Sequence, residues 1–226
     1  MPSEYLHAEA VASTLLLSTP PWHAKPLFDP RPGLLVAQLS ADRHWRASHD
    51  LRDWQREYER VLALLGWRHM LQEQIQPMRS GRSAVLLHEH LARGLTSLCH
   101  RQWAPAVART LKAIAATGQH SAALDILVSH GWHLGQLNLQ VALLDTDGTL
   151  LTFGLSDPSG ARGPLQGLNQ RVPTAARRLR MRSSVATLNT DLYAKVLDDL
   201  RAKLADRSSS AMAPFPHPLE SDSTLQ

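Results

Sequence analysis

The sequence predicts an α+β fold, and two changes of pattern along the chain indicate it. Between about residues 46 and 131, apolar side chains recur every three or four positions, as on one face of a helix. From Leu137 to Leu155 they recur every second position, which is typical of β-strands. A helical pattern returns at about 191–205 and closes the fold. Helices, a strand pair and a final helix are therefore expected in this order.

The helical region, 46–131, predicts a bundle of about four helices. The first follows Asp50, a residue type that caps helices, and it carries Trp54, Tyr58 and Leu62 on one face. The other three expected helices cover 83–103, 105–117 and 122–129. Short connections between helices favour antiparallel neighbours, which is the arrangement of a conventional bundle.

Residues 1–45 predict an N-terminal arm that wraps the main body. Prolines between Pro20 and Pro32 exclude a continuous helix or a central strand there. The expected local elements are a helix over 4–17 and a strand over 33–40, with Trp22 and Phe28 as anchors.

One α+β domain is expected over 46–206, followed by a tail. Its parts are the helical region 46–131, a β-hairpin over 136–155, and a basic segment with the final helix over 158–206. Residues 207–226 are rich in Ser and Pro and poor in large apolar side chains. Such a composition predicts a disordered tail.

The stretch VALLDTDGTLLTFG, residues 141–154, allows two interpretations. Its Asp-x-Asp-Gly-Thr resembles the start of phosphate-transferring enzymes of the haloacid dehalogenase superfamily, which implies Asp145 as nucleophile and Asp147 as general acid. Lys195, Asp198 and Asp199 share one short helical pattern, so they cannot occupy the separate strand ends that this chemistry requires. Because the alternation continues on both sides, we expect a hairpin turn with Gly148 in a left-handed conformation.

Composition indicates a soluble globular protein. Of 226 residues, 43% are hydrophobic and 19% charged, which excludes a disordered or fibrous chain. The single cysteine, Cys99, cannot form an intrachain disulfide, and no apolar run is long enough to span a membrane. A cytoplasmic location is the expectation.

No catalytic residue, metal site or cofactor is predicted. His88 and His90 are two residues apart, so they would diverge on a helix, whereas ligands that share a helical face lie three or four apart. Gly131 interrupts the helix between His130 and His133. A metal site assembled in space from these histidines remains an alternative.

One basic segment stands out. From Pro158 to Thr190 the chain has no Asp or Glu. Within this stretch the expected anion-binding residues are Arg171, Arg177, Arg178, Arg180 and Arg182. With Pro173 in its first turn, a helix here would spread the last four arginines over a broad stripe. Such a surface suits an acidic partner; a solvated helix face is the alternative.

The leading hypothesis is a non-enzymatic interaction protein, an adaptor or regulatory accessory factor that self-associates through the hairpin edge or a helical face. The alternative is a DNA- or RNA-binding accessory protein that uses the segment from Arg171 to Arg182. A phosphate-ester hydrolase acting through Asp145 and Asp147 is the third hypothesis. We expect the partner to be a protein or nucleic acid with an acidic surface.

Overall fold

The computed structural model describes residues 5–19, 29–48, 51–72, 76–77, 84–117, 121–133, 136–157, 165–173 and 179–216. The helices of this part are α1 (Arg31–Ser48), α2 (Leu51–Leu64), α3 (Leu87–Thr96), α4 (Ala104–Ala116), α5 (Ala122–Gly131) and α6 (Thr190–Ala211). The longer strands are β1 (His7–Val11), β2 (Thr14–Ser18), β3 (Trp67–Gln72), β7 (Gln136–Leu144), β8 (Thr149–Asp157) and β10 (Arg180–Leu188). The short strands are β4 (Gln76–Pro77), β5 (Ala84–Leu86), β6 (Trp132–His133), β9 (Arg171–Pro173) and β11 (Met212–Pro214).

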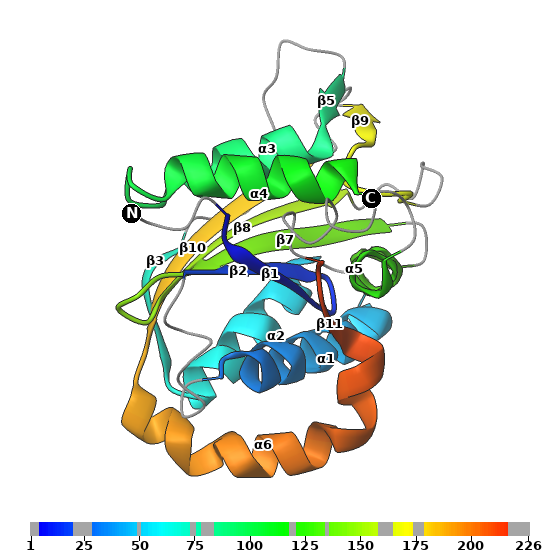
Figure 1. Ribbon diagram of the computed structural model, residues 1–226. Coiled ribbons are helices and arrows are strands. Elements are labelled where there is room, and N and C mark those ends of the chain that lie inside the picture. Colours follow the sequence, from blue (N-terminus) through cyan, green and yellow to red (C-terminus); the bar gives the residue numbers. More distant parts are fainter. Residues whose placement is uncertain are drawn as a thin grey trace, which may run out of the picture.

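A central sheet lies between helices on both of its faces (Figure 1). Its strands run in the order β11-β1-β2-β7-β8-β10-β3, with β4 beside β10 and β6 beside β7. The pair β2–β7 is parallel, and the other neighbours are antiparallel. A separate small sheet joins β5 to β9. The mixed α+β class is thus confirmed, with a sheet much larger than one hairpin.

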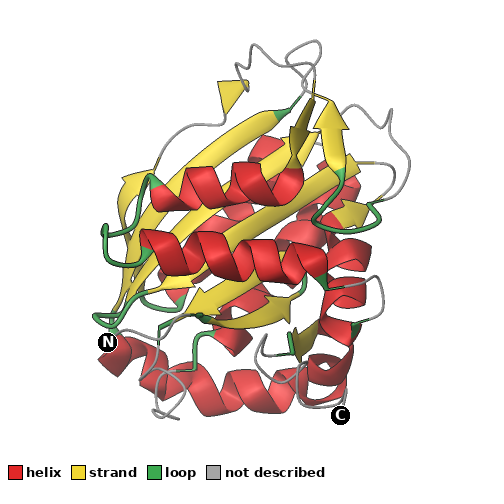
Figure 2. Cartoon of the chain, turned by 45° about the horizontal axis from the view of Figure 1, so that its top comes forward, coloured by secondary structure: helices red, strands yellow, loops and turns green. Residues whose placement is uncertain are grey.

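Two hydrophobic cores lie on opposite faces of the sheet. One is formed by α3, α4 and α5 against one face of β7, β8 and β10. The other is formed by α1, α2 and α6 against the opposite face. Helices α3 and α4 run side by side across the strands in Figure 2, and α6 lies on the far side of α1 in Figure 1. The four helices expected between 46 and 131 therefore do not form a bundle, because the sheet separates α2 from α3, α4 and α5.

The central strands β7 and β8 are buried on both faces. Leu144 pairs with Leu150 across the turn, and the pairing continues to Leu137 and Asp157. Strand β7 also pairs with β2, and β8 also pairs with β10. Both outer edges of this strand pair are thus occupied, so the expected self-association through the hairpin edge is wrong.

The N-terminal prediction is also wrong. The helix expected over 4–17 is a pair of strands, β1 and β2, inside the sheet, and the strand expected over 33–40 belongs to α1. Pro32 fits the first turn of a helix, where no backbone N–H is needed. The Tyr193 hydroxyl accepts a hydrogen bond from the Gly33 N–H at 3.0 Å and donates one to the Asp29 carbonyl at 2.8 Å. Trp22 and Phe28 lie outside the described residues.

Regular structure at the C-terminal end extends further along the chain than the sequence predicts. Helix α6 continues to Ala211, and β11 then pairs with β1. Phe215 is buried in the core beneath α5. The disordered tail expected from residue 207 is therefore wrong up to Phe215, and 217–226 lie outside the described residues. Within the described part, no helix is both long and apolar enough to cross a membrane.

Candidate anion-binding site

The structure places the predicted arginines on strands. Arg171 is exposed on β9, Arg180 is half-buried at the start of β10, and Arg182 is half-buried two positions later. Arg177 and Arg178 lie outside the described residues. The helical stripe expected from 171 to 182 is wrong, because both ends of that stretch are strands. Strand geometry sends Arg180 and Arg182 to the same face of the sheet.

A row of polar residues crosses the sheet at Arg182. Thr14 on β2 pairs with Gln140 on β7, Gln140 pairs with Gly154 on β8, and Gly154 pairs with Arg182 on β10. Hydrogen bonds follow the row: Arg182 Nη2 donates to Gln140 Oε1 at 2.8 Å, and Gln140 Nε2 donates to Thr14 Oγ1 at 2.6 Å. These four residues are called the polar row below.

Gly154 leaves the space through which Arg182 reaches Gln140. A Cβ atom at position 154 would lie 2.6 Å from Arg182 Nε and 3.0 Å from its Cγ. A side chain there would displace the arginine. Glycine inside a strand often marks such a close approach.

Helix α1 extends the polar row at its other end. The Gln38 amide donates to Thr14 Oγ1, and its Oε1 accepts from the Ser13 backbone N–H at 2.9 Å. Gln38 and Thr14 are fully buried. Both of these side chains therefore have hydrogen-bond partners, which is the condition for buried polar groups to be tolerated in a core.

Two aromatic rings of α2 cover Arg182. The guanidinium carbon lies 4.5 Å from the centre of the Trp54 ring and 5.8 Å from that of Tyr58. The two rings are stacked at 5.1 Å, and Trp54 Nε1 donates to Asp42 Oδ1 at 2.7 Å. A cation over the face of a tryptophan is attracted by the electrons of the ring. Trp54 is thus fixed in place as a platform for the arginine.

Arg182 as a whole is half-buried, but its guanidinium is enclosed by neighbouring side chains, and its electrostatics are unusual for such a group. Among the described residues, its guanidinium makes one side-chain hydrogen bond and no ion pair with a carboxylate. Burial lowers its pKa, and the nearby Tyr58 and Glu59 oppose that effect. A guanidinium has five N–H donors, and four of them stay free for another acceptor.

The Tyr58 hydroxyl lies in the same environment. Tyr58 is 5% exposed, and its hydroxyl has no hydrogen-bond partner in the described part of the chain. Burial raises the pKa of Tyr58 to about 12, and the positive charge of Arg182 opposes this effect. The neighbouring Gln140 side chain also lowers this pKa. The hydroxyl therefore stays protonated at neutral pH and can donate.

Asp145 and Asp147 lie in the turn between β7 and β8. Asp145 Oδ1 accepts from the Thr146 N–H at 2.6 Å and from Trp103 Nε1 at 3.0 Å. Asp147 Oδ1 accepts from the Thr149 N–H at 2.8 Å, and Gly148 has a φ of 86°. Both carboxylates thus accept hydrogen bonds from backbone N–H groups of the turn, and Asp145 also holds the Trp103 side chain.

The histidines of α3 point to different partners. His88 Nδ1 lies 3.2 Å from the Leu168 carbonyl, and His90 Nε2 lies 3.5 Å from Met181 Sδ. No three His, Cys, Asp or Glu side chains within the described ranges are grouped so that they could hold a metal ion.

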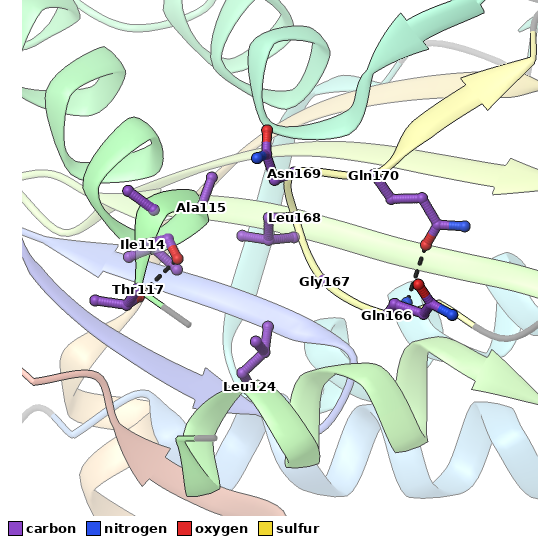
Figure 3. A pocket seen from close by; sticks show the side chains of 10 residues that line it. Ile114, Ala115, Thr117, Leu124, Gln166, Gly167, Leu168, Asn169 and Gln170 are labelled. Carbon is purple, nitrogen blue, oxygen red and sulfur yellow. Dashed lines mark hydrogen bonds between the residues drawn. The ribbon is translucent and has the colours of Figure 1, made fainter. Parts of the chain in front are cut away.

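A pocket of about 400 Å³ opens between the end of α4, the start of α5 and the loop before β9 (Figure 3). Its polar lining consists of Thr117, Gln166, Asn169 and Gln170. The Gln166 N–H donates to Gln170 Oε1 at 2.9 Å. None of the lining residues is charged, so this pocket does not suit an anion.

Compared with known protein families, characterised proteins and solved structures, the chain matches none of them. The sequence had indicated Arg180 and Arg182 among the functional candidates but not Gln140 and Tyr58. Gly154 inside a predicted strand was the available signal that another group approaches the backbone there.

Proposed function

We propose that the protein is a non-enzymatic interaction protein, an adaptor or regulatory accessory factor, that binds an acidic segment of a partner protein. The arginines of β9 and β10 form the binding surface. One observation supports this function: none of Arg171, Arg180 and Arg182 makes an ion pair with a described residue, in a stretch without Asp or Glu. Cations that the fold leaves without counterions attract an acidic partner.

A protein partner fits this arrangement better than a nucleic acid. A phosphate backbone is neutralised by a row of cations on the surface. Here Arg182 turns inward beneath Trp54, and Arg171 belongs to the small separate sheet. The described arginines therefore offer separate contacts rather than a continuous row, which suits a few carboxylates.

Fluorescence anisotropy with a labelled polyglutamate peptide tests this function. We expect binding at low salt that falls as salt is added, because exposed charges are screened. Changing both Arg171 and Arg180 to Gln should weaken binding by about tenfold, since exposed ion pairs contribute up to about 1 kcal/mol each.

The matched control changes Arg43 and Arg101, which are exposed elsewhere, to Gln. This variant loses the same charge and should bind like the wild type. Equal weakening of both double variants would mean non-specific attraction and would contradict the proposal. Tighter binding of duplex DNA, with a steep salt dependence that the Arg171 and Arg180 changes flatten, would favour the nucleic-acid alternative.

Self-association is the second proposed property, and the edge of β3 favours it. This strand ends the described sheet, and Met70 on it is 73% exposed. Leu64 and Leu192, 70% and 47% exposed, lie near its start, where a Cβ at Gly66 would be 3.2 Å from Leu192 Cβ. If a second copy paired antiparallel along β3, the free backbone groups at both edges would form hydrogen bonds. The Met70 side chain of each copy would then be covered by the other copy.

Light scattering after size-exclusion chromatography measures this property. We expect a dimer for the wild type and a monomer for Met70→Lys, because an edge lysine opposes strand pairing. Ala108→Lys adds the same charge at an exposed position of α4 and should stay dimeric. A wild type that remains monomeric at high concentration would exclude the β3 interface.

A further inference from the structure

Arg182 is held where a charge is difficult to bury. Its aliphatic part lies over Gly154, and its guanidinium is fixed between Gln140 and the Trp54 ring. This geometry orients the group but satisfies one of its five donors. A buried charge is normally accompanied by a counterion or by several hydrogen bonds. The arrangement thus holds the guanidinium ready for an acceptor that comes from outside the described fold.

The Tyr58 hydroxyl is a second donor without a partner, on the ring stacked against Trp54. Buried hydroxyls are nearly always hydrogen-bonded, so an orphaned one indicates a missing acceptor. Arg182 lies 5.8 Å from the centre of the Tyr58 ring. Within the described residues, a hydroxyl without a partner and a guanidinium with one of its donors used therefore lie close together beneath α2.

We propose that Arg182 and Tyr58 form a binding site for a carboxylate group, supplied by the acidic segment of the partner protein. The planar guanidinium matches the two oxygens of a carboxylate, and the hydroxyl adds a further donor to the same group. Gln140 and Trp54 are positioning residues, because they fix the guanidinium by a hydrogen bond and by ring contact. This inference rests on the proposed function, and it identifies Arg182 and Tyr58 as the most buried residues that contact the acidic segment of the partner.

The Nε–H signal of Arg182 in the NMR spectrum of the ¹⁵N-labelled full chain gives a direct measurement. Arg182→Lys identifies the signal by its loss. We expect a saturable shift on titration with sodium acetate, and none with sodium chloride at the same ionic strength. A phosphate titration is the second arm, and tighter binding of phosphate than of acetate would overturn the assignment to a carboxylate.

Tyr58→Phe is the decisive variant, because it removes the hydroxyl and keeps the stacked ring. We expect its half-saturating acetate concentration to rise at least about tenfold, as for a lost hydrogen bond to a charged group. Its melting temperature should be unchanged or raised, because the hydroxyl has no partner to lose. Wild-type affinity in Tyr58→Phe, or the absence of a saturable shift in the wild type, would overturn the proposal.

Glu73 supplies the internal control, because it stands in the sequence between β3 and β4, the strands that pair with β10. Glu73→Gln should bind acetate like the wild type. Tighter binding in this variant would mean that the chain fills the site itself, which overturns the proposal. Polyglutamate binding that persists without acetate binding would refute only this site, whereas loss of polyglutamate binding alone would refute the proposed function.

Discussion

The two faces of strand β8 differ in character, although each face of the sheet packs against an apolar core. On the side of α3, β8 presents Leu151, Phe153 and Leu155, all packed in an apolar core. On the side of α2, the same strand presents Thr152, Gly154 and Ser156. Side chains alternate between faces along a strand, so a single stretch encodes both surfaces.

The difference shows how stability and specificity are divided. The apolar face stabilises the fold through burial, which is roughly proportional to the area removed from water. A charged group on the other face adds little net stability, because removal of its hydration opposes its new contacts. Side-chain hydrogen bonds of the polar row join β10 to β7 and β7 to β2, and such specific pairs favour one register.

The largest effect is expected on the apolar face. Phe153→Ala should lower the free energy of unfolding by about 3–5 kcal/mol, the usual cost of removing a buried aromatic ring. Helix α3 approaches this ring closely, since a Cβ at Gly94 would lie 2.4 Å from it. Chemical denaturation measures the change. A loss below about 1 kcal/mol would show that α3 does not depend on Phe153.

On the polar face, Gln140→Leu should cost about 1–3 kcal/mol, because Arg182 loses its acceptor and Thr14 a donor. Combining it with Arg182→Met should restore most of that stability, since both polar partners are then replaced. The coupling is measured by a double-mutant cycle. Additive losses would mean that the two side chains act independently.

The stability of the side that carries α3 should also depend on pH, through His90. Burial lowers the pKa of His90, with a smaller contribution from the charge of Arg93. The unfolded chain then binds a proton more readily than the folded one, so wild-type stability falls as pH drops below about 6.5. His90→Leu should flatten this part of the curve, measured by thermal unfolding between pH 8 and 5. If the stability curves of the wild type and His90→Leu ran parallel over this pH range, His90 would not be the cause of the pH dependence.

The smallest effect is expected at Glu57 on α2. Hydrogen bonding to Arg60 lowers the pKa of Glu57 to about 2, and Ser40 contributes to the same effect. Its contribution is present above the ordinary value of 4.5 and is lost as pH falls toward 2. Glu57→Gln should cost less than about 1 kcal/mol at pH 7, because Arg60 is exposed. The two stability curves should converge near pH 2.

Local patterns in the sequence predicted part of this architecture. The apolar face of α2, with Trp54 and Tyr58 inward, and the strand expected over 137–144 are confirmed, but both faces of that strand are buried rather than one. Those patterns could not predict that α2 and α3 lie on opposite faces of the sheet. Helical periodicity shows that one face of a helix is buried, but not which element covers that face. Strand β1, with the sequence HAEAV, has helix-forming residues, and its strand state depends on pairing with β2 and β11.

The candidate site was less predictable than the fold. Arg182 was singled out by the lack of acids around it, but its contacts with Gln140 and Trp54 join positions more than 40 residues apart. Gln140 alternates with Leu139 and Val141 as a solvent-facing residue would. It is buried because α1 and α2 cover that face, which is a tertiary effect that a local pattern does not contain.

The pairing of β1 with β11 has a consequence for the order of folding. Val11 pairs with Met212, and the Ala12 N–H donates to the Ala211 carbonyl, so contacts about 200 residues apart complete the sheet. Closing so long a loop costs chain entropy and slows folding relative to local contacts. Strand β11 should therefore join the sheet late and be among the first elements to open in native-state hydrogen exchange.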